Sequence, residues 1–253
     1  MKTAPTFVAS LLAAGLMATA PGAAQEPASS DAAAFLAGKT RDCPKCELSG
    51  ANLQGRDLSG ANLSGARLSG ANLHAAKLVR TDLSGADLAG ADLTKASLRS
   101  AVLPGADLTG ALGYGANLEG ANLAGANLSG ARFQTARMTK ADMTGANLSG
   151  ADFKGARLAE ALLVRADVSH ANFTGVDFRQ ADLSSAIAEG TGFVRTAMID
   201  TRARFIMAQR ADFMQSDMTR ADFGGADLRG ANLRYAKRKF GKFEGIQVGN
   251  PPN

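Results

Sequence analysis

Cys43 and Cys46 are the residues of this 253-residue chain whose types and spacing most clearly suggest chemistry. They form a C-x-x-C pair and are the only cysteines in the sequence. A pair with this spacing is typical of a thiol redox site, of half a zinc site or of a disulfide. Zinc needs four ligands, and the sequence offers no second cysteine pair and no nearby histidine. The choice between redox chemistry and structure then depends on the element that carries the pair.

A five-residue repeat positions these cysteines and nearly every residue after them. From Leu48 to Leu233, 34 of 38 positions spaced five apart hold Leu, Phe, Met or Val. Two residues before each of these central positions, from Ala51 to Ala236, 30 of 38 positions hold Ala. A period of five fits neither an α-helix nor a flat strand. It predicts a β-solenoid in which the central residue and the alanine point inward, while the other three face water or form a corner.

The phenylalanines indicate how many pentapeptides close one coil. Five of them recur every twenty residues: Phe133, Phe153, Phe173, Phe193 and Phe213. Four pentapeptides per coil would place all five on one face, each about 4.8 Å from the next. The pattern therefore predicts a four-sided coil and a rod of about nine to ten coils.

Stretches such as Ala51-Asn52-Leu53 and Ala231-Asn232-Leu233 resemble the consensus A-[DN]-L-x-x of the pentapeptide repeat family. The resemblance covers about three quarters of the chain and implies an all-β fold, a right-handed quadrilateral β-helix, over residues 43–235. It implies much less about function, because most members of this family are uncharacterised.

The segments before and after the repeats have other predicted roles. Residues 1–24 are typical of a secretory signal peptide, with Lys2 before an apolar run that is too short to span a bilayer as a helix. An uncleaved anchor is the alternative, and export predicts a periplasmic or secreted protein. Residues 25–42 are expected to form a linker and a short capping helix between an N-cap at Asp31 and a stop at Gly38. Residues 236–253 are expected to form a basic C-terminal cap and tail, with Phe240 and Phe243 covering the last coil.

Several residues that depart from the repeat carry expectations of their own. Cys43 takes a central position and Cys46 an alanine position, so both should point into the first coil, where an oxidising compartment favours a structural disulfide or two buried thiols. Arg56 replaces an alanine near the open end and is expected to extend outward to water. Gly113 removes a large central residue, which predicts a bulged side. The weak consensus over residues 184–209 predicts distorted coils.

Folding the sequence on a twenty-residue coil assigns each charge to one of four faces, although the net charge of the chain is only +5. The face centred on Leu58, Leu78 and Leu98, called the basic face below, collects twelve basic and six acidic residues. The opposite face, centred on Leu48, Leu68 and Leu88, collects three basic and six acidic residues. The candidate binding residues of the basic face are Lys77, Arg80, Arg99, Arg137, Lys140, Arg157, Arg179 and Arg220. Such a face suits an anionic envelope component, either lipopolysaccharide or a lipid headgroup, or an acidic protein.

Other classes of function fit the sequence poorly. His74 and His170 lie about five coils, roughly 24 Å, apart on different faces, and the serines and threonines have no partner base. We therefore expect no enzyme, no metal and no cofactor. Some pentapeptide repeat proteins protect DNA gyrase by mimicking DNA, but a DNA-mimic topoisomerase-binding protein needs a strongly acidic surface. Direct nucleic-acid binding is also disfavoured, because the sequence offers almost no exposed aromatic residues on which bases could stack. The sequence predicts a non-catalytic binding or scaffolding protein of the cell envelope, with a solenoid end open to a homodimer.

Overall fold

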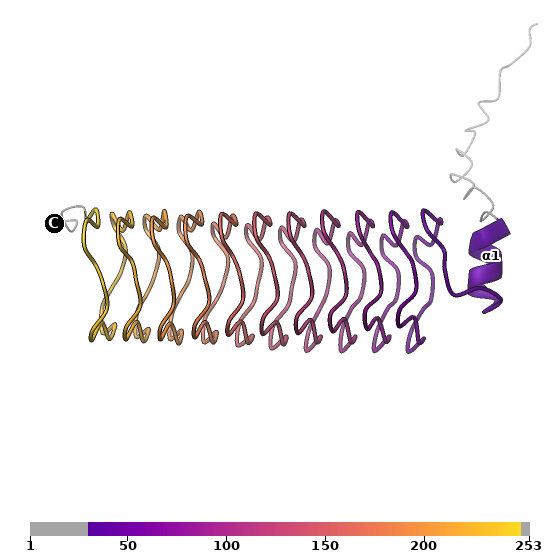
Figure 1. Cartoon of the computed structure of the whole chain (residues 1–253), viewed down its shortest axis with the longest axis horizontal. Coiled ribbons are helices and arrows are strands. Elements are labelled where there is room, and N and C mark those ends of the chain that lie inside the picture. Colours follow the sequence, from indigo (N-terminus) through magenta and orange to yellow (C-terminus); the bar gives the residue numbers. More distant parts are fainter. Residues whose placement is uncertain (1–29, 249–253) are drawn as a thin grey trace, which may run out of the picture.

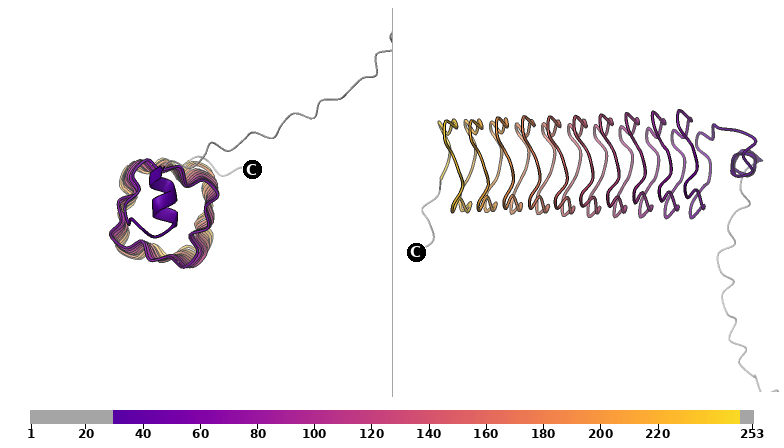
Figure 2. Two further views of the ribbon diagram at one scale, coloured as in Figure 1. Left: turned by 90° about the vertical axis from the view of Figure 1, so that its right-hand side faces the viewer. Right: turned by 90° about the horizontal axis from the view of Figure 1, so that it is seen from below.

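Parallel β-bridges between residues twenty apart build this protein, whose computed structural model describes residues 30–248. The bridges run without interruption from Glu47↔Arg67 to Asp227↔Gln247, which makes ten coils of twenty residues. Viewed along the axis the coils superpose in a square outline, and viewed from the side they form a straight rod (Figures 1 and 2). The predicted right-handed quadrilateral β-helix is therefore confirmed. The predicted signal peptide, residues 1–24, lies outside the described residues.

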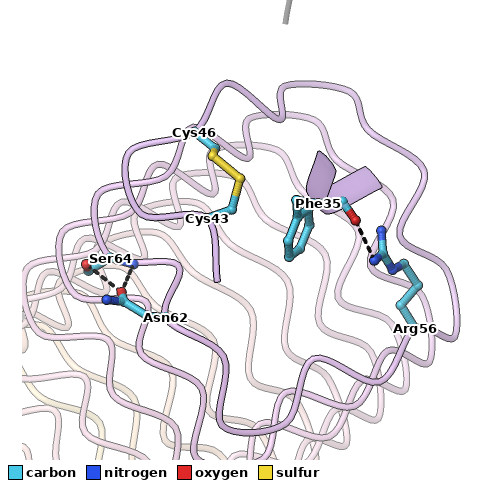
Figure 3. Close-up of a disulfide and its surroundings, with 6 residues drawn as sticks. All are labelled: Phe35, Cys43, Cys46, Arg56, Asn62 and Ser64. Atoms are coloured by element: carbon cyan, nitrogen blue, oxygen red, sulfur yellow. Dashed lines mark hydrogen bonds between the residues drawn. A yellow bond between two sulfur atoms is a disulfide. The ribbon is translucent and has the colours of Figure 1, made fainter. Parts of the chain in front are cut away.

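Each corner is a tight turn that the pentapeptide sequence favours. The N–H of Ala51 donates to the carbonyl of Leu48 over 3.0 Å, and Gly50 between them has a φ of +65°. A positive φ at the third turn residue is the pattern of a type II turn, which glycine adopts without steric cost. The Asx residue before the central residue supports many corners: Oδ1 of Asn62 accepts from both the N–H and the hydroxyl of Ser64 (Figure 3). The repeat thus specifies its own corners.

The core consists of stacked columns of large central residues and small alanines. Leu88 and Ala91 are both fully buried, and the same two positions are buried in nearly every pentapeptide up to Leu228. The N–H of Leu88 donates to the carbonyl of Asp107 in the next coil over 2.6 Å, so the columns and the ladder share one register. Phe133, Phe153, Phe173, Phe193 and Phe213 stack in one column with ring centroids 4.8–5.9 Å apart. This confirms the predicted phenylalanine face.

Two predicted irregularities are absent, because large neighbours fill the space that small residues leave. No bulge forms at Gly113: its N–H donates to the carbonyl of Arg132 over 2.7 Å, as in regular coils. A Cβ at Gly113 would lie 2.1 Å from the ring of Phe133, so that ring occupies the vacant volume. Residues 184–209 also keep every bridge. Their small central residues coincide with large residues at the alanine positions: Ala188, Ala203 and Ala208 with Thr191, Thr196, Thr201 and Ile206.

A short helix covers the N-terminal end of the rod. Helix α1, Ser30–Leu36, lies across the square opening of the first coil, and Phe35 is fully buried there (Figure 2). The helix begins at Ser30, so Asp31, the predicted N-cap, lies in its first turn. Arg56 does not extend outward as predicted. Its guanidinium lies 4.7 Å from the ring centroid of Phe35 and donates to the Phe35 carbonyl over 2.8 Å (Figure 3). This carbonyl at the end of α1 accepts a second hydrogen bond from the N–H of Gly38.

The C-terminal end differs from the prediction of a separate basic cap. The ladder continues past residue 235, with bridges Asp217↔Lys237 and Asp222↔Lys242, so the basic segment is itself the last coil. Phe243 stacks on Phe223 at 5.5 Å, but Phe240 is 73 % exposed because it falls on a corner position. Within residues 30–248 no helix is long and apolar enough to cross a membrane.

Candidate functional site

The coil register brings the predicted basic residues together on one side of the rod. Bridges join Asp57, Lys77, Ser97, Asn117, Arg137, Arg157 and Asp177 into a single line along this face. The remaining candidates flank that line: the backbone of Arg80 bonds that of Arg99, and the backbone of Lys140 bonds that of Ala159. All eight candidate side chains are exposed: Lys77, Arg80, Arg99, Arg137, Lys140, Arg157, Arg179 and Arg220.

Four of these eight side chains pair with carboxylates on the same face. Nζ of Lys77 lies 3.8 Å from Asp57, and Nζ of Lys140 lies 3.5 Å from Glu160. Two arginines make bidentate contacts: Arg179 holds Asp177 and Arg220 holds Asp200, each with a shortest distance of 2.6 Å. These ion pairs within the protein neutralise much of the positive charge that the sequence analysis expected to bind an external ligand.

The bidentate pairs also lower the pKa of their carboxyl groups. The hydrogen bond from Arg179 lowers the pKa of Asp177, and the nearby charge of Arg157 lowers it further. The hydrogen bond from Arg220 likewise lowers the pKa of Asp200. Both carboxylates therefore stay charged at neutral pH and neutralise their arginines.

The other four candidates have no ion pair among residues 30–248: Arg80, Arg99, Arg137 and Arg157. They lie in the N-terminal and middle coils of the face, whereas Arg179 and Arg220 lie farther along. Among the eight candidates, those without an ion pair therefore all lie before residue 160. Sequence reasoning missed this division because it counted charges for each face and did not pair individual residues; Arg179, for example, pairs with Asp177 only two residues away.

The cysteines and histidines offer little chemistry in this arrangement. Cys43 and Cys46 form a disulfide with Cα atoms 5.4 Å apart, buried at the first coil beside α1 (Figure 3). His74 lies 4.0 Å from Asp92, at the limit of an ion pair, and His170 has no carboxylate partner among residues 30–248. The same part of the chain contains no group of three or more His, Cys, Asp or Glu side chains able to hold a metal ion.

A surface hollow lies on the opposite face. It has a volume of about 490 Å³ and is lined by Ile187, Glu189, Met207, Gln209, Arg210 and Arg229. Its charges are satisfied internally, because Glu189 pairs with Arg210 and Asp227 holds Arg229. The hollow is shallow, and none of its side chains could act as an acid or base with a free partner.

Comparison with known families agrees with the coil geometry. The profile of the pentapeptide repeats matches eight copies in residues 46–85, 76–112, 116–155, 151–187 and 199–236. The chain belongs to the pentapeptide repeat family. A comparison with curated protein sequences gives no match.

Several solved structures of pentapeptide repeat proteins are similar to this chain. HetL, a protein involved in heterocyst differentiation regulation in the cyanobacterium Nostoc sp. strain PCC 7120, is 31 % identical over 83 % of this chain and 90 % of its own, with a TM-score of 0.44. The plasmid-mediated fluoroquinolone resistance protein QnrB1 is 18 % identical over 78 % of this chain and 92 % of its own, with a TM-score of 0.46. A protein of the Arabidopsis thaliana thylakoid lumen is 28 % identical over 52 % of this chain and 64 % of its own, with a TM-score of 0.23.

Proposed function

We propose that this protein is an exported scaffold of the cell envelope whose basic face binds an anionic component, either lipopolysaccharide or a lipid headgroup. Pentapeptide repeat proteins are generally non-catalytic binding or scaffolding proteins, which agrees with the lack of a reactive cluster among the described residues. The observation that carries the proposal is the row of exposed basic side chains on one face, four of them without an ion pair. The signal-like residues 1–24 support a periplasmic or secreted location.

Salt-dependent retention on a polyanion tests this function. The full chain is passed over immobilised lipopolysaccharide and over anionic vesicles across a salt series, because attraction between exposed charges is screened over about 10 Å at 0.1 M salt. One variant replaces Arg80, Arg99, Arg137 and Arg157 by Glu. A control variant replaces Arg67, Arg210 and Arg229, exposed on the opposite face, by Glu. The first variant should lose retention and the control should keep it. Equal retention of the two, or none by the parent, contradicts the proposal.

A protein partner remains a second candidate ligand for the same face. An acidic protein would bind through the same unpaired arginines, whereas a partner recognised by shape would show little salt dependence and no preference between faces. A topoisomerase partner that binds through DNA mimicry is disfavoured, because five of the six acids of the basic face already pair with arginine or lysine. No effect of the purified chain on gyrase supercoiling is expected.

The C-terminal end of the rod also suits a second copy of this chain. Leu233, Phe243 and Ile246 are only partly buried there, and no residue between 30 and 248 covers them as α1 covers the other end. Open solenoid ends favour end-to-end association. A dimer in analytical ultracentrifugation that a Phe243→Asp change converts to monomer would support this arrangement.

A further inference from the structure

The residue that precedes each central residue, called the rung position, forms a ladder along each face, and many of its side chains are charged. Each rung is bridged to the rungs twenty residues before and after it, so neighbouring rung side chains lie about 4.8 Å apart. Basic residues occupy eight rungs: Arg67, Lys77, Arg132, Arg137, Arg157, Arg202, Lys237 and Lys242. Opposite charges on adjacent strands stabilise a sheet, and like charges directly opposite destabilise it.

Seven of the eight basic rungs have an opposite charge on an adjacent strand. Each has an acidic rung next to it, for example Glu47 and Asp87 beside Arg67, or Asp182 and Asp222 beside Arg202. Arg137 is the exception, because its neighbours are Asn117 and Arg157. Along the described ladder, Arg137↔Arg157 is the single bridge that joins two basic residues.

The acid on the far side of Arg157 forms its ion pair with another arginine. Asp177 is already held by both Nε and Nη2 of Arg179, at 2.9 and 2.6 Å. Neither Arg137 nor Arg157 makes an ion pair with another residue of the range 30–248, and both side chains are exposed. Two guanidinium groups therefore stand side by side on the basic face without an ion pair to the protein, although the charge of Asp177 acts on Arg157 from a greater distance.

Paired guanidinium groups on neighbouring strands suit a ligand with several oxygens and negative charge. Each guanidinium presents a planar fork of N–H donors that matches a phosphoryl group, and two forks about 4.8 Å apart can grip one group from both sides. We infer that Arg137 and Arg157 form a specific site for a phosphomonoester group. This site rests on the proposed function of the basic face, within which it selects phosphate among other anions.

The test removes the planar guanidinium groups while it keeps their positive charges. The variant Arg137→Lys, Arg157→Lys retains both positive charges but loses the forks, and the matched control is Arg80→Lys, Arg99→Lys on the same face. Thermal unfolding is recorded in sodium phosphate and in sodium chloride of equal ionic strength. Retention is measured on phosphatidylcholine vesicles carrying phosphatidic acid, a phosphomonoester, or phosphatidylglycerol, a phosphodiester.

Phosphate should raise the melting temperature of the parent and of the control, and not that of the Arg137→Lys, Arg157→Lys variant. The preference for phosphatidic acid over phosphatidylglycerol should fall several-fold in that variant alone. A response to inorganic phosphate without retention on vesicles supports a site for free phosphate and rejects the envelope function. Retention without any phosphomonoester preference, or a preference unchanged in the variant, overturns the site and leaves the envelope function standing.

A second variant separates ligand binding from a structural role. Arg137→Asn restores the residue type that is common at rung positions and removes the contact between like charges. In phosphate-free buffer this variant should melt at a higher temperature than the parent and should show no response to phosphate. A lower melting temperature would mean that Arg137 stabilises the coil, and it would overturn the inference.

Discussion

The corners of the solenoid differ between its two halves, although the backbone does not. Between residues 50 and 155, sixteen of twenty-two corner residues with positive φ are glycine, whereas between 160 and 245 only five of eighteen are. A left-handed conformation costs about 1–2 kcal/mol for a residue with a Cβ. The C-terminal half therefore forms the same corners at a higher conformational cost, and its ladder must hold them in place.

The two halves also fill the core differently. In the N-terminal half leucine and alanine alternate, as at Leu88 and Ala91. Around residue 200 small central residues such as Ala203 accompany Thr201, whose hydroxyl donates to the carbonyl of Phe178 over 2.7 Å. The comparison shows that the period sets the coil, while some pentapeptides exchange the large and small inward residues, as at Thr201 with Ala203 and Ile206 with Ala208.

The largest expected effect comes from breaking a leucine column in the regular half. Leu88→Ala removes a fully buried side chain from rigid surroundings and should lower the free energy of unfolding by about 2–5 kcal/mol. Urea unfolding followed by circular dichroism measures it. The same column holds Ala188 and Ala208 without distortion, so a loss well below this range would mean that the regular half can also collapse around a small residue.

Gly113→Ala tests whether one ring replaces a missing side chain. The new Cβ would lie 2.1 Å from Phe133, and overpacking of this kind should cost about 1–3 kcal/mol. Gly192→Ala is the matched control, because its Cβ would approach no atom closer than 3.8 Å and its φ is not positive. Equal stability of the two variants in thermal unfolding would contradict the account of this coil.

At the alanine position, enlarging the residue in the N-terminal half and shrinking it in the C-terminal half should both lower the free energy of unfolding. Ala91→Thr adds volume beside Leu93 and leaves a hydroxyl to satisfy, which should cost about 1–3 kcal/mol. Thr201→Ala removes volume beside Ala203 and a buried hydrogen bond, which should cost about 1 kcal/mol. Chemical denaturation measures both. Stabilisation by Thr201→Ala would mean that volume is not exchanged between the two positions.

The smallest expected effects are at the corners. Gly130→Ala places a Cβ at a φ of +62° with no atom within 4 Å, so only the backbone conformation is tested, and a loss of about 1 kcal/mol is expected. Ala75→Gly is the reverse change at a φ of +53°, and it should stabilise by up to about 1 kcal/mol. Differential scanning calorimetry resolves these differences. Destabilisation by Ala75→Gly would mean that the lost chain stiffness outweighs the relieved strain.

Sequence alone predicted the fold because its dominant signal, a fixed period, maps directly onto the ladder. The inward positions, the four-sided coil and the phenylalanine column all follow from that period. The errors occurred where a residue's neighbour along the axis mattered more than its own type. Gly113 looked like a defect until Phe133 filled its volume, and Arg56 looked like a solvent-exposed residue until α1 offered it a carbonyl and a ring.

The candidate site was predicted less completely. The eight basic residues could be assigned to one face from their numbers alone. Their pairing could not be read from a face count, because it depends on side-chain reach along and across the ladder. Arg179 forms an ion pair with Asp177, two residues before it, so Arg157 forms none with this neighbouring rung.

The constant register of twenty residues has a consequence for how such a chain can change in length. An insertion or deletion of twenty residues leaves every later side chain on its original face, whereas one of five residues turns the whole downstream rod by a quarter of a revolution. Both keep the inward positions inward. A five-residue deletion between Arg99 and Arg137 would therefore leave the core packed while moving Arg137 and Arg157 out of line with Arg80. The face on which a surface residue lies is set by its position within the twenty-residue repeat. Duplication of a whole coil is therefore the change in length that keeps every residue on its face.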